Sequence, residues 1–133
     1  MPIEHINPTT LPKARGYVQV VKASGGTTVY IAGQTAHDLD GTLIGPGDHY
    51  AQFKQAFTNL KCALAAAGAG PEHVVKATFY VVESSEAVLG DFIRGMNDAL
   101  DGESLPSAST FLGVERLAFD DMLVEVDAIA VID

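Results

Sequence analysis

The stretch LVEVDAIAV, residues 123–131, alternates like a β-strand and is apolar on both of its faces. One face presents Val124, Val126, Ala128 and Ala130, and the other presents Leu123, Ile129 and Val131. Two carboxylates, Glu125 and Asp127, interrupt this run. A carboxylate among apolar neighbours costs free energy unless something binds it or pairs with it. The stretch therefore predicts a strand with two buried faces and, within it, a candidate site.

Four further strands are predicted by the same kind of pattern. Residues 109–116 (STFLGVER) precede the stretch 123–131, and residues 74–82 (VVKATFYVV) form an alternating run earlier in the chain. Residues 17–23 and 28–33 are rich in β-formers and are separated by SGGT, whose glycines are free to take positive φ. We therefore expect these two runs to form a β-hairpin, followed by an irregular loop over residues 34–47.

Two amphipathic helices complete the predicted order of elements. The first begins at Asp48, a good N-cap, and ends at Gly68, and the second begins near Ser84 or Ser85 and runs to Leu100. Each helix has a single apolar stripe, so both should cover one face of the sheet. The prediction is an α+β domain with the order β-β-α-β-α-β-β, a mixed sheet and two helices on one face. The other apolar face must leave water, which predicts a homo-oligomer that packs sheet against sheet.

Composition and charge limit the function classes. A chain of 133 residues with 47% hydrophobic and 19% charged residues fits one packed domain over residues 1–133. Seventeen acids against eight bases give a net charge of −9, which argues against nucleic acid as a partner. No run approaches the roughly 18 apolar residues of a membrane span, and the N-terminus lacks the features of a signal peptide. We therefore expect no membrane partner and a cytoplasmic location.

Motifs for metal, nucleotide or nucleophilic chemistry are missing from the sequence. There is no G-x-S-x-G, H-E-x-x-H, P-loop or G-x-G-x-x-G pattern. The four histidines, His5, His37, His49 and His73, are scattered, and the single cysteine, Cys62, excludes an internal disulfide. The expectation is that the protein binds no metal.

Residues at the ends of the predicted strands are the remaining candidates for a binding site. Small residues at Ala32 and Gly33 would let backbone N–H groups approach a ligand closely. Glu125 in a cleft could hold a water molecule and shuttle protons. The alternative for Glu125 is a carboxylate at a strand edge, in water or paired with a Lys or Arg, and the pattern alone leaves both open.

Several short motifs in a shared order make the chain resemble a known family. They include GYVQ at 16–19, IAGQ at 31–34, AAG at 66–68, VKATFYV at 75–81 and VEVDAIAV at 124–131. The sequence is similar over nearly its whole length to the Rid family, also called the YjgF/YER057c/UK114 family and, in older usage, endoribonuclease L-PSP. The resemblance implies a chorismate-mutase-like fold, a homotrimer, and three ligand clefts between neighbouring subunits. It also implies hydrolysis of reactive enamines and imines to 2-oxo acids and ammonia, without a cofactor.

The resemblance also points to the site residues, and here the chain departs from the family. Active members grip the substrate carboxylate with an arginine, and the matching position is Ser109, which cannot neutralise a carboxylate. Two further family contacts are changed, because Ala32 replaces a small hydroxyl residue and Phe111 replaces a cysteine. The expected catalytic residue is Glu125, and the expected ligand-binding residues are Arg15, Tyr17, Ala32, Gly33, Asp91, Ser109, Thr110 and Phe111.

Three functions remain open at this point. The first is a deaminase-type enzyme that hydrolyses an imine or enamine with an altered substrate range. The second is a non-catalytic trimer that binds a small molecule or regulates a partner, and the third and least favoured is an endoribonuclease. We hypothesise that Arg15, two residues before Tyr17, supplies part of the charge missing at Ser109. The alternative is that Arg15 is a solvated arginine.

Overall fold

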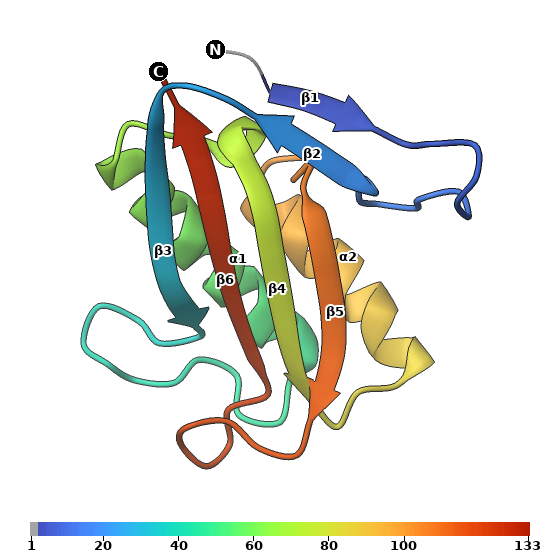
Figure 1. Cartoon of the computed structure of the whole chain (residues 1–133). Helices are drawn as coiled ribbons and strands as arrows, with labels where there is room; N and C mark the ends of the chain where they lie inside the picture. The colour runs from blue at the N-terminus through green and yellow to red at the C-terminus, as the bar shows by residue number, and fades with distance from the viewer. Residues whose placement is uncertain (1–2) are drawn as a thin grey trace.

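The computed structural model describes residues 3–133 as one mixed sheet backed by two helices (Figure 1). The sheet order is β3-β6-β4-β5, in which β4 and β5 run parallel and the other neighbouring strands run antiparallel. Both helices lie behind this sheet, so its other face, here called the open face, is not covered by a helix. The elements of this domain are β3 (Thr27–Thr35), α1 (His49–Ala66), η1 (Pro71–His73), β4 (Val74–Val82), α2 (Glu86–Ala99), β5 (Ala108–Val114) and β6 (Val124–Ile132).

The predicted α+β class, the mixed sheet and the two helices on one face are confirmed. Helix α1 begins where Asp48 caps it, since the Asp48 carboxylate accepts a hydrogen bond of 3.0 Å from the Ala51 N–H. The helix ends before Gly68, whose φ of +77° allows the chain to turn back. Helix α2 begins after Ser85, although the Ser85 side chain makes no capping hydrogen bond.

The core lies between the sheet and the helices. Val124 and Val126 of β6 have no exposed surface, as predicted for one face of this strand. Phe92 of α2 is at the centre of an aromatic cluster, with its ring centroid 4.8 Å from that of Phe79 and 5.2 Å from that of Phe111. This cluster joins α2 to β4 and β5 and so sets the distance between the helix and the edge of the sheet.

The predicted hairpin of residues 17–23 and 28–33 is wrong. Strand β2 (Val20–Ala23) pairs antiparallel with β1 (Ile3–Ile6), a strand that was not predicted, and β3 pairs with β6. Figure 1 shows β1 and β2 as a separate two-stranded ribbon at one end of the sheet. The physical reason is burial, because pairing with β6 packs Val29 and Ile31 of β3 against the core, whereas Val20 stays exposed on its ribbon.

Two polar side chains of α1 form hydrogen bonds with the backbone of neighbouring loops. Gln52, which is fully buried, donates to the carbonyls of Gly45 and Asp121 at 3.1 and 2.9 Å and accepts from the Leu123 N–H at 2.8 Å. Asn59 donates to the carbonyls of Thr35 and His37 at 2.9 and 2.8 Å. These bonds satisfy backbone groups where β3 ends and β6 begins, so they fix the positions of both strands.

Residues 3–133 contain three helices, α1, α2 and the short η1 turn. None of them is long and apolar enough to cross a membrane.

Two glycines of α2 give a matched test of the helix packing. A Cβ on Gly95 would lie 2.7 Å from Phe53 Cβ and 3.0 Å from the Lys54 nitrogen of α1, whereas a Cβ on Gly90 would meet nothing within 4 Å. Gly90→Ala should raise the free energy of unfolding by about 0.5–1 kcal/mol, because alanine is the better helix former. Gly95→Ala should lower it by about 1–3 kcal/mol, because the helices must separate. Urea denaturation of both variants measures this, and equal shifts of the same sign would contradict the close helix crossing.

Candidate functional site

A cavity of about 860 Å³ lies between α2 and β5 and is here called the α2–β5 cavity. Its floor is aromatic, with Phe79, Phe92 and Phe111 side by side, and its α2 wall contains Ile93 and Met96. Four of the predicted site residues line it together: Arg15, Tyr17, Ser109 and Phe111. We call these four residues the cavity half of the candidate site.

The alternation of β5 explains why Ser109 and Phe111 share this side. Ser109 is paired with Ala77 of β4 and Phe111 with Phe79, and both partners are buried on the helix side of the sheet. The segment that contains Arg15 and Tyr17 is held against the start of β5 by a hydrogen bond of 3.1 Å from the Val18 N–H to the Ser107 carbonyl. Gln19 secures the other end of that segment, since its N–H donates to Asn7 Oδ1 at 2.8 Å.

Glu125 lies on the opposite, open face of the sheet. It is half-buried, is paired with Tyr80 of β4 and Thr35 of β3, and lies between Val124 and Val126, which point into the core. A Cβ placed on Gly33 would lie 1.9 Å from Glu125 Oε2, so the carboxylate rests directly over this glycine. Glycine is thus required at position 33 for Glu125 to adopt its observed position.

A β-bulge in β3 forms the space that Glu125 occupies. Ile31 pairs with Ala128 and Gln34 pairs with Val126, so that Ala32 and Gly33 together oppose one residue, Asp127. The Gln34 side chain donates to the Ala32 carbonyl at 3.1 Å and supports the bulge. Ala32, Gly33 and Glu125 therefore lie together, and we call them the acid half of the candidate site.

Asp127 has a structural partner on the same face. The Tyr80 hydroxyl donates to Asp127 Oδ2 at 3.1 Å. Burial raises the pKa of Tyr80 above its ordinary value, and the hydrogen bond to Asp127 adds to this shift because a negative neighbour disfavours the phenolate. The hydrogen bond from Tyr80 gives Asp127 a structural role. Of the two carboxylates in residues 123–131, Glu125 therefore remains as the candidate catalytic group.

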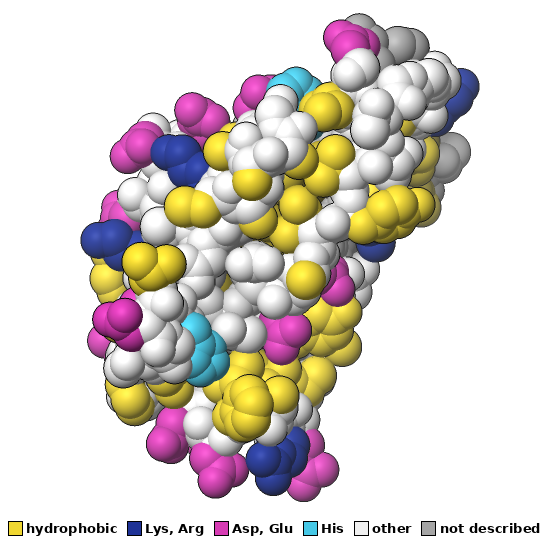
Figure 2. Space-filling model, turned by 90° about the vertical axis from the view of Figure 1, so that its left-hand side faces the viewer, with side chains coloured by type: hydrophobic (Ala, Val, Ile, Leu, Met, Phe, Trp, Pro, Cys, Tyr) yellow, Lys and Arg dark blue, Asp and Glu magenta, His cyan; other side chains and the backbone are white. Residues whose placement is uncertain are grey.

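The two halves cannot form one pocket within a single protomer. Ser109 is on β5 and Glu125 is on β6, two strands or about 10 Å apart, and their side chains leave the sheet on opposite faces. The cavity half lies at the β5 edge, and the acid half lies toward the β3 edge, which faces the viewer in Figure 2. In that view hydrophobic side chains gather where the β1–β2 ribbon projects from the sheet, and acidic side chains are spread around them from the top to the bottom of the molecule.

Thr110 belongs to neither half. It is exposed on the open face, where the Lys76 ammonium group is 3.4 Å from its hydroxyl. The reason is the alternation of β5, which turns Thr110 away from the side that Ser109 and Phe111 share.

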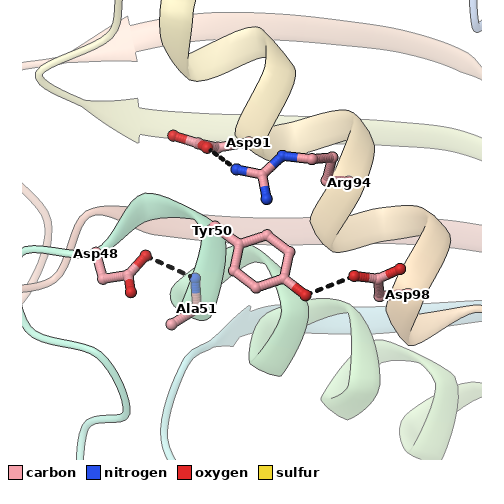
Figure 3. Close-up of polar contacts among 6 residues, drawn as sticks. All are labelled: Asp48, Tyr50, Ala51, Asp91, Arg94 and Asp98. Atoms are coloured by element: carbon pink, nitrogen blue, oxygen red, sulfur yellow. Dashed lines mark hydrogen bonds and ion pairs between the residues drawn. The ribbon is translucent and has the colours of Figure 1, made fainter.

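Asp91 also lies away from both halves, in a polar cluster between α1 and α2 (Figure 3). Asp91 Oδ1 is 2.5 Å from Arg94 Nη2, and the Arg94 guanidinium lies 4.6 Å from the centroid of the Tyr50 ring. The Tyr50 hydroxyl donates to Asp98 at 2.5 Å, and this hydrogen bond is the main cause of the raised pKa of Tyr50. These contacts join the two helices, which is a structural role.

The sequence reasoning missed the α2 contribution to the cavity. Leu89, Ile93, Met96 and Asn97 line the cavity, and they recur at helical spacing on one side of α2. The signal that could have found them is that the apolar stripe of α2 is wider than one packed face needs, since Leu89 and Ile93 remain 42% and 52% exposed.

No metal site is present among residues 3–133, because no three His, Cys, Asp or Glu side chains lie close enough to hold an ion. Three of the histidines have local partners instead. His49 Nε2 donates to the Val82 carbonyl at 2.8 Å, His37 Nδ1 lies 2.7 Å from Thr35 Oγ1, and His73 Nδ1 accepts from the Gly70 N–H at 3.0 Å.

Comparison with known proteins identifies the family. The model of the endoribonuclease L-PSP family matches residues 8–132. The chain belongs to this family, the Rid family. It is 37% identical over 123 residues to a RutC family protein of Pyrococcus abyssi, covering 90% of this chain and 89% of that protein.

Solved structures of Rid-family proteins have the same fold. The Yersinia pestis protein YyfB superimposes with a TM-score of 0.90 at 36% identity, covering 99% of this chain and all of that one. RidA of an Antarctic Psychrobacter has a TM-score of 0.67 at 28% identity, covering 97% of this chain and 99% of that one. This chain therefore has the fold of a Rid-family domain.

The tyrosine pair gives a pH-dependent prediction. Asp127→Asn should lower the pKa of Tyr80, and the matched variant Asp98→Asn should lower the pKa of Tyr50, since each removes a negative neighbour. The folded protein keeps both phenols protonated above their ordinary pKa of 10.0, so the free energy of unfolding should fall as pH rises past that value. Absorbance titration of tyrosinate measures the shifts, and a titration curve unchanged by either variant would contradict the assignment.

Proposed function

We propose that the protein is a homotrimer that binds a small reactive metabolite in clefts between subunits and hydrolyses an imine or enamine there. The observation that carries this proposal is the separation of the cavity half and the acid half onto opposite faces and toward opposite edges of one sheet. A site that uses both halves requires two copies of the chain.

A closed ring of subunits would bring the halves together. Strands β3 and β5 are the two edges of the sheet, so a head-to-tail contact can place the acid half of one subunit beside the cavity half of the next. Three such contacts close a ring of three subunits, in which every acid half is paired with a cavity half. The open face also has partly apolar strands to bury, with Ile129 on β6 and Leu112 on β5.

Glu125 has the environment that water activation needs. It is half-buried, has no ion-pair partner among residues 3–133, and is held over Gly33. Its carboxylate would take a proton from water as the oxygen attacks the imine carbon, and would return a proton to the nitrogen. The second proton of the water, now on the added hydroxyl, passes to the nitrogen as the C–N bond breaks, which releases ammonia and leaves the carbonyl product with the oxygen of the water.

A binding trimer without catalysis is the second candidate function. It is favoured by Ser109, which lies in the cavity half where active family members have an arginine, and by the exposed position of Arg15. The ribonuclease activity in the family name has the least support, because a net charge of −9 repels a polyanion.

A direct assay distinguishes enzyme from binding protein. We expect the protein to accelerate the decay of 2-aminoacrylate generated in situ by a pyridoxal-phosphate enzyme, with ammonia and the 2-oxo acid as products. Glu125→Gln should reduce the rate at least about 100-fold, because it removes the general base. Gly33→Ala should also reduce it, since the new Cβ displaces the carboxylate while the acid is kept.

Glu115→Gln is the matched control, because Glu115 is an exposed acid outside both halves and its loss should leave the rate unchanged. No acceleration over buffer by the parent protein would refute hydrolysis of this enamine and favour the binding trimer.

Mixed trimers test whether the site is shared. Glu125→Gln leaves the cavity half intact, and Ile93→Trp, which should fill the cavity, leaves the acid half intact. If the two inactive variants are unfolded, mixed and refolded together, about a quarter of the clefts combine two intact halves, and about a quarter of the parent activity should return. Sedimentation measures the trimer in the same samples. Mixtures that stay as inactive as either variant alone, in confirmed mixed trimers, would show that one subunit forms the whole site.

A further inference from the structure

We propose that the ligand of this protein has a bulky apolar arm, of aryl or branched-alkyl size, and a single anionic group that Arg15 binds. The arm occupies the α2–β5 cavity. This inference rests on the proposed inter-subunit cleft and specifies the chemical class of molecule that enters it.

The size and lining of the cavity require the apolar arm. A volume of about 860 Å³ is in the range of sites for drug-sized ligands, whereas a metabolite with only a methyl or methylene side chain would leave most of it to water. The walls cannot hold that water well, because Phe92, Phe111 and Met96 offer no hydrogen-bonding groups of normal strength. An aryl or branched-alkyl group would displace it and gain the hydrophobic free energy of this surface.

The floor of the cavity suits a flat or branched group in particular. The rings of Phe92 and Phe111 meet at 80°, and those of Phe79 and Phe92 at 59°, so the rings of the floor are inclined to one another rather than stacked in parallel. Ile93, 52% exposed, and Tyr17, 37% exposed, stand at the cavity as apolar surface that the protomer itself leaves uncovered. Edge-to-face and offset-stacked aromatic contacts are both favourable for a ligand ring.

The charge of Arg15 indicates that the ligand has an anionic group. Arg15 is the one charged side chain that lines the cavity, and no carboxylate pairs with it among residues 3–133. Ser109 and Asn97 provide neutral polar groups in the same lining. In a protein of net charge −9, an arginine without an acidic partner beside an apolar cavity is complementary to a monoanion with an apolar arm.

Binding of three simple probes to the full-length protein tests both parts of the inference. Hydrocinnamate has the aryl arm and the anion, propionate lacks the arm, and hydrocinnamamide lacks the charge. Calorimetry should show that propionate binds roughly 30-fold or more weakly than hydrocinnamate, which is the effect of burying a phenyl group. Hydrocinnamamide should bind about tenfold more weakly, because it loses the charged contact with Arg15.

Paired variants assign the effects to residues. Ile93→Trp should fill the cavity and weaken hydrocinnamate at least about tenfold, whereas Ala87→Trp, on an exposed position of α2 outside the cavity, should not. Arg15→Gln should bring hydrocinnamate close to hydrocinnamamide in affinity. Arg116→Gln, an exposed arginine on Asp120 outside this cavity, is its control and should bind both probes like the parent.

The possible results test the apolar arm, the role of Arg15 and the proposed function separately. Equal affinities of propionate and hydrocinnamate would overturn the apolar arm, and equal affinities of hydrocinnamate and hydrocinnamamide would overturn the role of Arg15. Hydrolysis of 2-aminoacrylate with no binding of hydrocinnamate would also overturn this inference, by showing that a neighbouring subunit fills the cavity, while the proposed function stands. Loss of 2-aminoacrylate hydrolysis alone, with hydrocinnamate bound as expected, would remove the catalytic proposal and leave the ligand class intact.

Discussion

The pairing of β6 with both β3 and β4 is the constraint on which the rest of the structure depends. It directs Val124, Val126, Ala128 and Ala130 into the core, where their burial stabilises the sheet against the helices. The same alternation sends Glu125 and Asp127 to the open face. A shift of one residue in register would bury both carboxylates among the phenylalanines, so the register is strongly selected.

The two carboxylates of β6 have different surroundings on the open face. Asp127 is held by the Tyr80 hydroxyl, whereas Glu125 rests over a glycine in a bulge that β3 would not need for pairing alone. The bulge interrupts the ladder between Ile31 and Gln34, and Asn59 of α1 compensates by binding the backbone of Thr35 and His37 just beyond it. The acid half is therefore supported from the helix layer through the end of β3.

The aromatic cluster connects stability to ligand choice. Phe92 packs against Phe53 and Phe57 of α1 on one side and against Phe111 at the cavity on the other. Gly95 lets the two helices approach closely, and this fixes how far α2 stands from β5. The width of the α2–β5 cavity thus follows from the core packing, and Phe111 and Ser109 give it the apolar, uncharged wall on which the proposed ligand class depends.

The sequence by itself determined the α+β class, the two helices, the ends of α1 at Asp48 and Gly68 and the strand over residues 74–82, because these depend on local periodicity and capping. It also indicated the family, through the resemblance of several short motifs in a shared order. Only the tertiary structure decided that β2 pairs with β1 rather than β3, that Asp91 and Thr110 do not line the α2–β5 cavity, and that α2 does line it. Strand pairing depends on which distant partner buries the most apolar surface, and short-range pattern carries no such information. For the same reason, only the alternation of β5 and β6 within one sheet places Ser109 and Glu125 on opposite faces.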